Sequence, residues 1–170
     1  MSSTPTGRRE LRDGTPYVVY TRTFAAPIED VWAAVTEPER LVRWIGTWAG
    51  DPASGEVAFR MTAEGEDAPE ERYRIDVCEP PRRLVTRSWV GDDTDTMVWQ
   101  LELDLTESDG VTTLTFGQVM ADPAMAESVG PGWDYYLDRL VAAESGREVS
   151  AVVWDAYYPA QSDFYRGAFS

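Results

Sequence analysis

Histidine, the commonest general acid–base residue, is absent from this sequence, and cysteine occurs once. Catalytic triads, histidine-activated cysteine nucleophiles and most zinc sites need an imidazole, so these kinds of site are excluded. The single cysteine, Cys78, has no basic neighbour in sequence, which is typical of an inert thiol. The acid pairs Glu70-Glu71 and Asp92-Asp93 fall in expected turns, where solvated charge is a simpler interpretation than an acid–base pair. We therefore expect no catalytic residue, no metal and no cofactor.

The chemistry that the sequence does offer is aromatic, because it contains seven tryptophans, eight tyrosines and five phenylalanines. Indole rings are bulky, hard to pack closely, and carry an N–H that needs a partner. A surface lined by such rings with a few polar tips suits a hydrophobic or aromatic ligand. The open alternative is that these side chains only fill the core, since apolar alternation does not distinguish lining from filling.

The elements that must position these rings are mostly strands. Residues 17–24 are β-branched and aromatic and predict a first strand, and two short helices follow at 28–36 and 37–44. Apolar and polar residues then alternate along several further segments, as in an antiparallel sheet with one solvated face. These expected strands are 47–50, 56–63, 72–78, 84–90, 96–106 and 112–119. Helices at the two ends of a strand run indicate an α+β fold.

A long helix is predicted at 130–144 from its apolar spacing. Trp133, Tyr136, Leu137 and Leu140 recur at i, i+3, i+4 and i+7, which is the stripe of an amphipathic helix. Pro131 is expected in the first helical turn, where proline is tolerated. We expect a curved sheet to grip this helix and the space between them to be the functional site.

The charge of the chain limits its partners. Thirty acidic and fifteen basic residues give a formal net charge of −15, which repels phosphate backbones and anionic membranes, so neither nucleic acid nor membrane is expected as a partner. No stretch approaches the roughly 18 unbroken apolar residues of a membrane span, and the first residues lack the apolar segment of a signal peptide. Because a lone cysteine cannot form an internal disulfide, we expect a cytoplasmic protein.

A length of 170 residues suits one domain rather than two. We expect the polar residues 1–15 to be flexible and residues 16–146 to form the folded domain. Residues 147–170 are too aromatic for a solvated arm. We expect this C-terminal extension to pack as short helical turns on the domain or on a partner subunit, in which case the protein is a homodimer.

Residues 19–48 resemble the opening of the START-like (SRPBCC) superfamily, and within it the homologues of the activator of a heat-shock protein ATPase. The resemblance is carried by Arg22-Thr23-Phe24, Ala26-Pro27, Val31-Trp32, Ala34, Thr36, Pro38, Trp44, residues 79–84, residues 110–116 and Gly132-Trp133. It covers about residues 17–146. It implies a helix-grip fold, in which a seven-stranded antiparallel sheet wraps around a long C-terminal helix, usually with a cavity between them. Members include lipid carriers, polyketide cyclases and bacterial stress-response proteins.

The predicted function is the binding of a small hydrophobic or aromatic molecule in that cavity, without catalysis. The residues expected to contact the ligand are Trp44, Trp48, Phe59, Met61, Tyr73, Ile75, Trp89, Trp99, Leu101, Phe116, Gln118, Trp133, Tyr136, Leu137 and Leu140. Within 84–90 the facing is open: either Val85, Arg87 and Trp89 point inward, or Leu84, Thr86 and Ser88 do. An inward Arg87 would imply a carboxylate-bearing ligand.

Two other functions remain open at this point. One is a cyclase- or hydrolase-like enzyme in which Tyr73, Tyr136 or Gln118 positions a reactive intermediate. The other is a protein-interaction module similar to the co-chaperone relatives. Those relatives carry a further N-terminal domain that we do not find in this sequence, so a chaperone partner is not expected.

Overall fold

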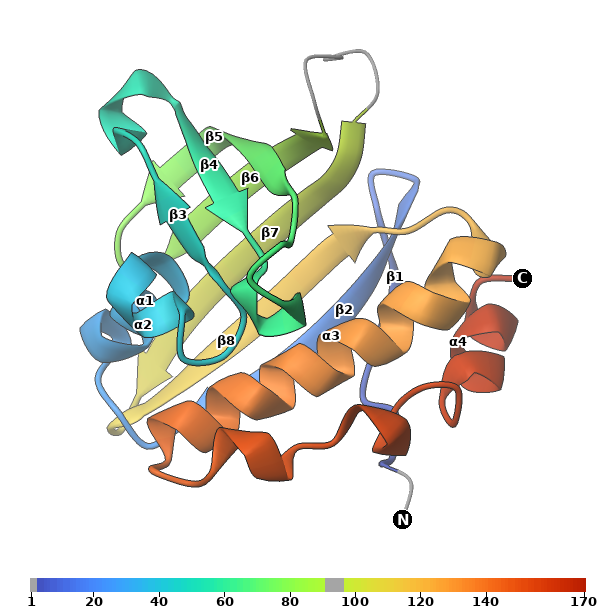
Figure 1. Cartoon of the computed structure of the whole chain (residues 1–170). Coiled ribbons are helices and arrows are strands. Elements are labelled where there is room, and N and C mark those ends of the chain that lie inside the picture. Colours follow the sequence, from blue (N-terminus) through green and yellow to red (C-terminus); the bar gives the residue numbers. More distant parts are fainter. Residues whose placement is uncertain (1–2, 91–96) are drawn as a thin grey trace. The chain divides into compact units, whose positions relative to one another are not determined.

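The computed structural model describes residues 3–90 and 97–170, and within them the chain has an α+β fold (Figure 1). One antiparallel sheet has the strand order β1-β2-β8-β7-β6-β5-β4-β3. The strands are β1 (Arg8–Arg12), β2 (Thr15–Phe24), β3 (Thr47–Ala49), β4 (Glu56–Arg60), β5 (Glu70–Glu79), β6 (Arg83–Val90), β7 (Met97–Ser108) and β8 (Val111–Val119). The helices are α1 (Ile28–Thr36), α2 (Pro38–Leu41), α3 (Pro123–Glu144) and α4 (Ser162–Ala168), with short 3₁₀ turns at Pro52–Ser54, Thr62–Glu64, Val149–Ala151 and Trp154–Ala156. The predicted α+β class with a long C-terminal helix, a helix-grip-like arrangement, is confirmed.

The chain divides into two compact units, which we describe separately. Unit 1 consists of Met1–Arg22 and Thr115–Ser170, and unit 2 consists of Thr23–Leu114. The expected turn around Asp92-Asp93 lies outside the described residues.

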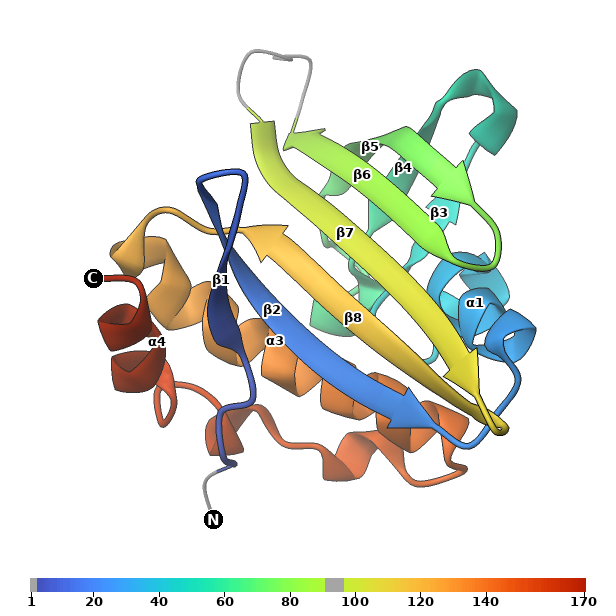
Figure 2. The same ribbon diagram turned by 180° about the vertical axis from the view of Figure 1, so that it is seen from behind.

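The described sheet has eight strands where seven were expected, and the additional strand is β1 in unit 1. Residues 1–15 were expected to be flexible, yet β1 pairs with β2 in a hairpin that Figure 2 shows from behind. Asp13 and Gly14 both have positive φ at its turn, 52° and 80°. An Asp-Gly pair is favoured in two-residue hairpin turns because both positions need positive φ. This dipeptide is the signal in the sequence that identifies the strand.

Helix α3 of unit 1 begins seven residues earlier than predicted. The Asp122 carboxylate accepts a hydrogen bond of 2.9 Å from the Ala124 backbone N–H, and Pro123 occupies the first turn. Pro131, which was expected in that position, therefore lies inside the helix. The error arose because a capped start at 122–124 and an interior proline at 131 both match the sequence rules for a first turn.

The aromatic extension at 147–170 also belongs to unit 1. It forms two 3₁₀ turns and α4, and α4 lies beside the N-terminal half of α3 (Figure 1). Tyr165 of α4 is fully buried, and a Cβ atom added at Gly130 of α3 would overlap its ring. The lack of a side chain at Gly130 therefore makes room for the Tyr165 ring.

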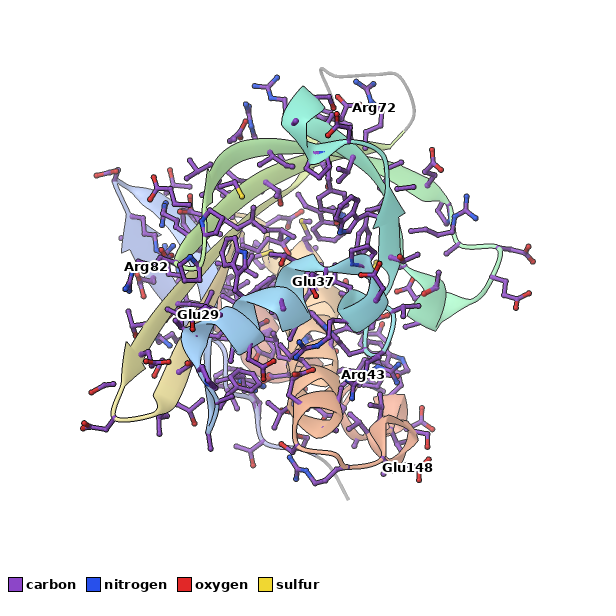
Figure 3. The ribbon with its side chains drawn as sticks, turned by 90° about the vertical axis from the view of Figure 1, so that its left-hand side faces the viewer. Glu29, Glu37, Arg43, Arg72, Arg82 and Glu148 are labelled. Atoms are coloured by element: carbon purple, nitrogen blue, oxygen red, sulfur yellow. The ribbon has the colours of Figure 1, made fainter. Side chains whose placement is uncertain are left out.

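In unit 2, strands β3 to β7 are consecutive neighbours, and α1 and α2 lie beside them. Arg72 near the start of β5 lies far from Arg82 in the turn after β5, and Glu29 and Glu37 mark the two ends of α1 (Figure 3). The β5–β6 register shifts between Ile75 and Val77. Because no residue of β6 is paired with Asp76 in this register, Val77 lies on the opposite face from Ile75, although simple alternation predicted the same face.

Candidate functional site

One face of unit 2 brings together many of the predicted ligand contacts, and we call it the Tyr73 face. The strand register pairs Tyr73 with both Val57 and Ser88, and pairs Ser88 with Trp99. Paired residues in neighbouring strands point to the same side of a sheet. The Tyr73 face comprises Trp48, Val57, Phe59, Glu71, Tyr73, Ile75, Thr86, Ser88, Trp99 and Leu101.

The apolar side chains on the Tyr73 face are unevenly buried. Leu101 is buried, whereas Phe59, Tyr73, Ile75 and Trp99 keep part of their surface exposed to solvent. The Phe59 and Tyr73 rings meet edge to face with centroids 5.1 Å apart. The predicted residue Met61 follows β4 and is also half-buried. The face therefore presents aromatic surface that the folded chain leaves incompletely covered.

Glu71 is a carboxylate among these rings. Tyr73 and Trp99 donate hydrogen bonds to it, while its Oε2 atom is buried and has no hydrogen-bond partner among the described residues. Burial raises the pKa of the Glu71 carboxyl, and the bonds from Tyr73 and Trp99 oppose that rise. Burial and the neighbouring Glu71 raise the pKa of the Tyr73 hydroxyl. Glu71 was interpreted from sequence as a solvated turn residue, but β5 begins at Glu70 and turns its side chain onto this face.

The opposite face of unit 2 holds Trp89 and Arg87. In the register Arg87 pairs with Arg74 and Trp89 pairs with Arg72. The Arg74 and Arg87 guanidinium carbons lie 5.6 and 5.8 Å from the Trp89 ring centroid, and Arg87 binds Asp76 at 2.5 and 3.1 Å. The sequence left open which side chains of β6 point inward. In the structure, Thr86 and Ser88 lie on the same face as Tyr73. Trp89 was predicted as a ligand contact but lies away from the Tyr73 face, and an inward Arg87 is ruled out.

Trp44 and Trp48 are tied to α1. Trp44 Nε1 donates to the Ala34 carbonyl oxygen at 3.0 Å, and Trp48 Nε1 donates to that of Thr36 at 2.7 Å. The last carbonyl groups of a helix have no partner within the helix, so these indoles satisfy them. Trp44 is buried in the core, whereas Trp48 stays half-buried on the Tyr73 face.

The remaining predicted residues lie in unit 1. Leu137 and Leu140 are core residues and Tyr136 is buried. Phe116 and Trp133 have ring centroids 4.3 Å apart, and Trp133 Nε1 donates to Gln118 Oε1 at 2.5 Å. Because an indole N–H can only donate, this bond fixes the Gln118 amide with Nε2 as its free end. Gln118 is fully buried, and Nε2 has no partner among the described residues.

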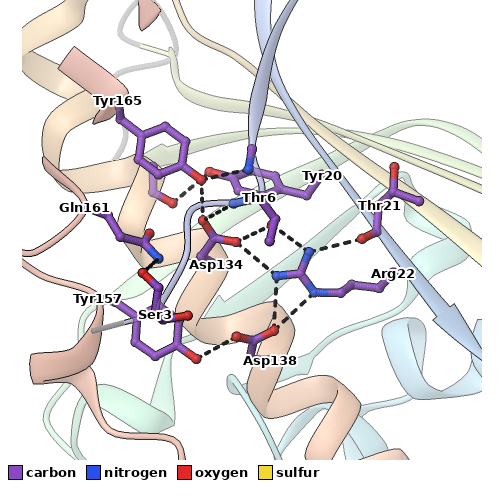
Figure 4. A network of polar contacts seen from close by, with 12 residues as sticks. Ser3, Thr6, Tyr20, Thr21, Arg22, Asp134, Asp138, Tyr157, Gln161 and Tyr165 are labelled. Carbon is purple, nitrogen blue, oxygen red and sulfur yellow. Dashed lines mark hydrogen bonds and ion pairs between the residues drawn. The ribbon is translucent and has the colours of Figure 1, made fainter. Parts of the chain in front are cut away.

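Sequence reasoning missed a polar network on α3, which Figure 4 shows. Asp134 is only 1% exposed, and it accepts hydrogen bonds from the Tyr165 hydroxyl, from Thr6 and, at 3.0 Å, from Arg22 Nη2. Arg22 also contacts Asp138 at 3.1 Å. The sequence analysis placed Asp134 and Asp138 outside the apolar stripe, and no local pattern shows that two distant terminal segments supply their partners.

The outer part of this network joins the two terminal segments of unit 1. Asp138 accepts a bond of 2.6 Å from the Tyr157 hydroxyl. The Ser3 backbone N–H donates to the Ala156 carbonyl oxygen at 2.8 Å, and Gln161 Nε2 donates to that of Ser3 at 3.2 Å. All the contacts shown in Figure 4 are internal to unit 1, so the network has a structural role.

The family model described as Activator of Hsp90 ATPase homolog 1-like protein matches residues 25–144. The chain belongs to this family. The match confirms the resemblance that residues 19–48 indicated, and it includes every residue of the Tyr73 face. No curated protein is similar enough to count as a match.

Solved structures show the same fold. The crystal structure of CalU16 from Micromonospora echinospora is 23% identical, with a TM-score of 0.68 over 98% of this chain and 97% of its own. A protein from Arthrobacter aurescens is 20% identical, with a TM-score of 0.64 over 81% and 91%. DynU16, from the dynemicin biosynthetic locus, is 23% identical, with a TM-score of 0.58 over 78% of this chain and 49% of its own. At these identities the likeness concerns the fold alone.

Within 3–90 and 97–170, no group of three or more Cys, Asp or Glu side chains is arranged to hold a metal ion. No helix in the described part of the chain combines the length and apolar character needed to span a membrane.

Proposed function

We propose that this chain is a binding protein for a small hydrophobic or aromatic molecule, and that the molecule packs on the Tyr73 face of unit 2. The observation that carries the proposal is the partial exposure of Phe59, Tyr73 and Trp99 on one face, beside the half-buried carboxylate of Glu71. Side chains that only filled a core would be covered, as Leu101 and Leu103 are. The absence of histidine supports binding over the commonest forms of catalysis.

The energetics favour a flat, apolar ligand. Removing apolar surface from water contributes roughly 25 cal/mol per Å², so affinity grows with the area that the ligand covers. Phe59 and Tyr73 meet edge to face. A ligand ring that met one of them in the same way would gain about 1 kcal/mol of binding free energy beyond its buried area. Polar groups on such a surface chiefly fix the orientation of the ligand.

A ligand panel with two matched variants tests this function. Wild-type protein should show a saturable rise in Tm with at least one aromatic compound, and native mass spectrometry should detect a one-to-one complex. Phe59→Ala should abolish the rise, because it removes a ring from the Tyr73 face. Val77→Ala, on the opposite face of the same unit, should retain it. Equal ligand responses in both variants would contradict the proposed site.

A second candidate is an enzyme acting on the same face, and the raised pKa of Glu71 favours it. A carboxyl group whose pKa is raised by burial is suited to carry a proton in general acid–base catalysis. In this case the bound compound is converted, and Glu71→Gln stops the conversion while leaving the complex intact. Mass spectrometry of the recovered compound distinguishes the two functions, since a binding protein returns it unchanged.

A further inference from the structure

We infer that β1, the edge strand of the sheet in unit 1, pairs antiparallel with β1 of a second copy of this chain, with Leu11 opposite Leu11. This interaction surface is independent of the proposed ligand-binding function. Three properties of β1 carry the inference: the backbone groups on its outer side, the order of its charges, and the position of Tyr165 at one end of it.

The outer side of β1 offers backbone groups to a further strand. β1 stands first in the order of the described sheet and pairs with β2 on its inner side. Arg12 and Thr15 flank the two-residue turn at Asp13-Gly14, and the two residues in that position exchange hydrogen bonds. Because bonded and non-bonded pairs alternate along a ladder, Arg9 and Leu11 direct their N–H and C=O groups to the outer edge.

The backbone contacts of the neighbouring residues agree with this alternation. Pro16 lies opposite Leu11 and has no N–H, and its carbonyl oxygen accepts from the Met120 N–H at 2.8 Å on the other side of β2. The Gly7 N–H points outward like those of Arg9 and Leu11, and it donates to the Tyr165 hydroxyl at 2.9 Å. Helix α4 therefore occupies the edge at Gly7 but not at the residues that follow.

The side chains along this edge are accessible. Leu11 is 57% exposed, more than Trp154 or Phe164 in the aromatic extension. Arg9 is also exposed, and the Glu10 side chain is 39% exposed. Charged residues protect an edge strand from pairing when a second strand would bring like charges opposite them. The order of the charges in β1 therefore decides whether a second copy is repelled or attracted.

The segment 9–13 is complementary to itself in an antiparallel pair centred on Leu11. In that register Glu10 of each copy lies opposite Arg12 of the other, and Arg9 lies opposite Asp13. Opposite charges placed directly across two strands stabilise the pair, and the apolar Leu11 side chains meet at its centre. The edge thus attracts a second copy of the same chain, although the chain as a whole is acidic.

The other registers open to the outward-facing residues are unfavourable. Alignment of Arg9 with Leu11 places Glu10 against Glu10 and Arg8 against Arg12, which are like charges. Alignment of Arg9 with Arg9 again opposes like charges. It also requires the outer N–H of Gly7, which is already bound to Tyr165.

The register centred on Leu11 also fits beside α4. The second copy turns back at Asp13-Gly14, opposite Arg9, and so ends before Gly7 and Tyr165. The Phe164 ring meets that of Tyr165 edge to face with centroids 5.1 Å apart. The paired edge is therefore continuous with the exposed aromatic surface of the extension.

Disulfide cross-linking tests the register. Leu11→Cys and Arg9→Cys are each made in a Cys78→Ser background, because the native thiol is exposed. In the proposed pair the two residues at position 11 have Cα atoms about 5.5 Å apart, which suits a disulfide, whereas those at position 9 are about 14 Å apart. Leu11→Cys should cross-link about tenfold faster than Arg9→Cys under the same mild oxidation. Equal rates, or a faster Arg9→Cys, would overturn the register.

Charge reversal tests the pairing itself. Glu10→Arg sets an arginine against Arg12, and Arg12→Glu sets a glutamate against Glu10, so each variant alone should dimerise about tenfold more weakly than wild type. A one-to-one mixture of the two variants restores opposite charges across the strands. Native mass spectrometry should then detect the mixed dimer, which also shows that both variants are folded.

Arg147→Glu is the control, because it makes the same change of charge as Arg12→Glu at an exposed residue outside β1. It should leave the affinity between copies within about twofold of wild type. Three results would each overturn the pairing: a wild-type protein that stays monomeric, a mixture of the two variants that stays monomeric, or a dimer that neither charge reversal weakens. The last result would assign the dimer to a different surface.

Discussion

The Ser162 hydroxyl donates a hydrogen bond of 2.7 Å to the backbone carbonyl oxygen of Glu127. In an uninterrupted helix that carbonyl would accept from the N–H of residue 131, four positions later. Residue 131 is a proline and has no N–H, so Ser162 supplies the donor that α3 lacks. The C-terminal extension therefore repairs the helix on which it packs.

This repair predicts coupling between Ser162 and Pro131. Ser162→Ala should lower the free energy of unfolding by about 1–2 kcal/mol, because it leaves the Glu127 carbonyl without a partner. In a Pro131→Ala background the same substitution should cost less, since the alanine N–H can then donate to Glu127. Urea denaturation of both single variants and the double variant measures the coupling. Ser150→Ala, on the surface of the extension, is the control and should have little effect.

Two glycines of α3 should respond in opposite ways to alanine. Gly130→Ala places a methyl group in the Tyr165 ring and should cost about 1–3 kcal/mol. Gly132→Ala meets no atom within 4 Å and should add about 0.5–1 kcal/mol through its better helix propensity. Both are measured by the midpoint of denaturant unfolding. A gain from Gly130→Ala would contradict the close packing of α4 on α3.

Asp76 should contribute to stability above about pH 4. A hydrogen bond from Arg87, aided by Arg74, lowers the pKa of the Asp76 carboxyl below its usual value. Because the folded pKa is lower than the unfolded one, near 3.9, the contribution is complete above 3.9 and is lost as the pH falls through the folded pKa. Asp76→Asn should therefore lower stability at pH 7 and flatten the loss of stability in acid. Asp163→Asn, at a carboxyl that is 93% exposed, is the control. Parallel pH profiles of wild type and Asp76→Asn would refute the assignment.

The aromatic extension is expected to join two copies of the chain. Trp154, Tyr158 and Phe164 are 39%, 37% and 48% exposed, and the Trp154 and Tyr158 rings stack with centroids 5.4 Å apart. Exposed apolar surface of this extent favours association. Light scattering should give twice the chain mass for wild type and a lower mass for a Trp154→Ser, Phe164→Ser variant. Val42→Ser removes an equally exposed apolar residue from unit 2 and should leave the mass unchanged. A monomeric wild-type protein would disprove the dimer.

The strands, and most of the residues on the Tyr73 face, could be predicted from the alternation of apolar and polar residues. Tyr73, Ile75, Trp99 and Leu101 share a face because the pleat fixes a period of two, and that period is visible in the sequence. The register shift at Asp76 was not predictable, because a local irregularity leaves the composition of the strand unchanged. This register shift alone determines which face of the sheet Val77 lies on.

Long-range partners account for the remaining differences. The facing of Arg87 depends on Asp76, eleven residues away and in the neighbouring strand. The role of Asp134 depends on Thr6 and Tyr165, which lie 128 and 31 residues away. A sequence read locally shows only that these residues are charged or aromatic, and pairing over such distances is a property of the folded chain.

Asp134 receives donors from both terminal segments, from Thr6 on one side and Tyr165 on the other, and the Tyr165 hydroxyl also accepts from the Gly7 N–H at 2.9 Å. Limited proteolysis at one end should therefore loosen the other. Cleavage before α4 removes Tyr165, deprives Gly7 of its acceptor, and leaves a buried acid with fewer donors. Fusion tags and truncations at either end of the chain will act on the same residue in the middle of α3.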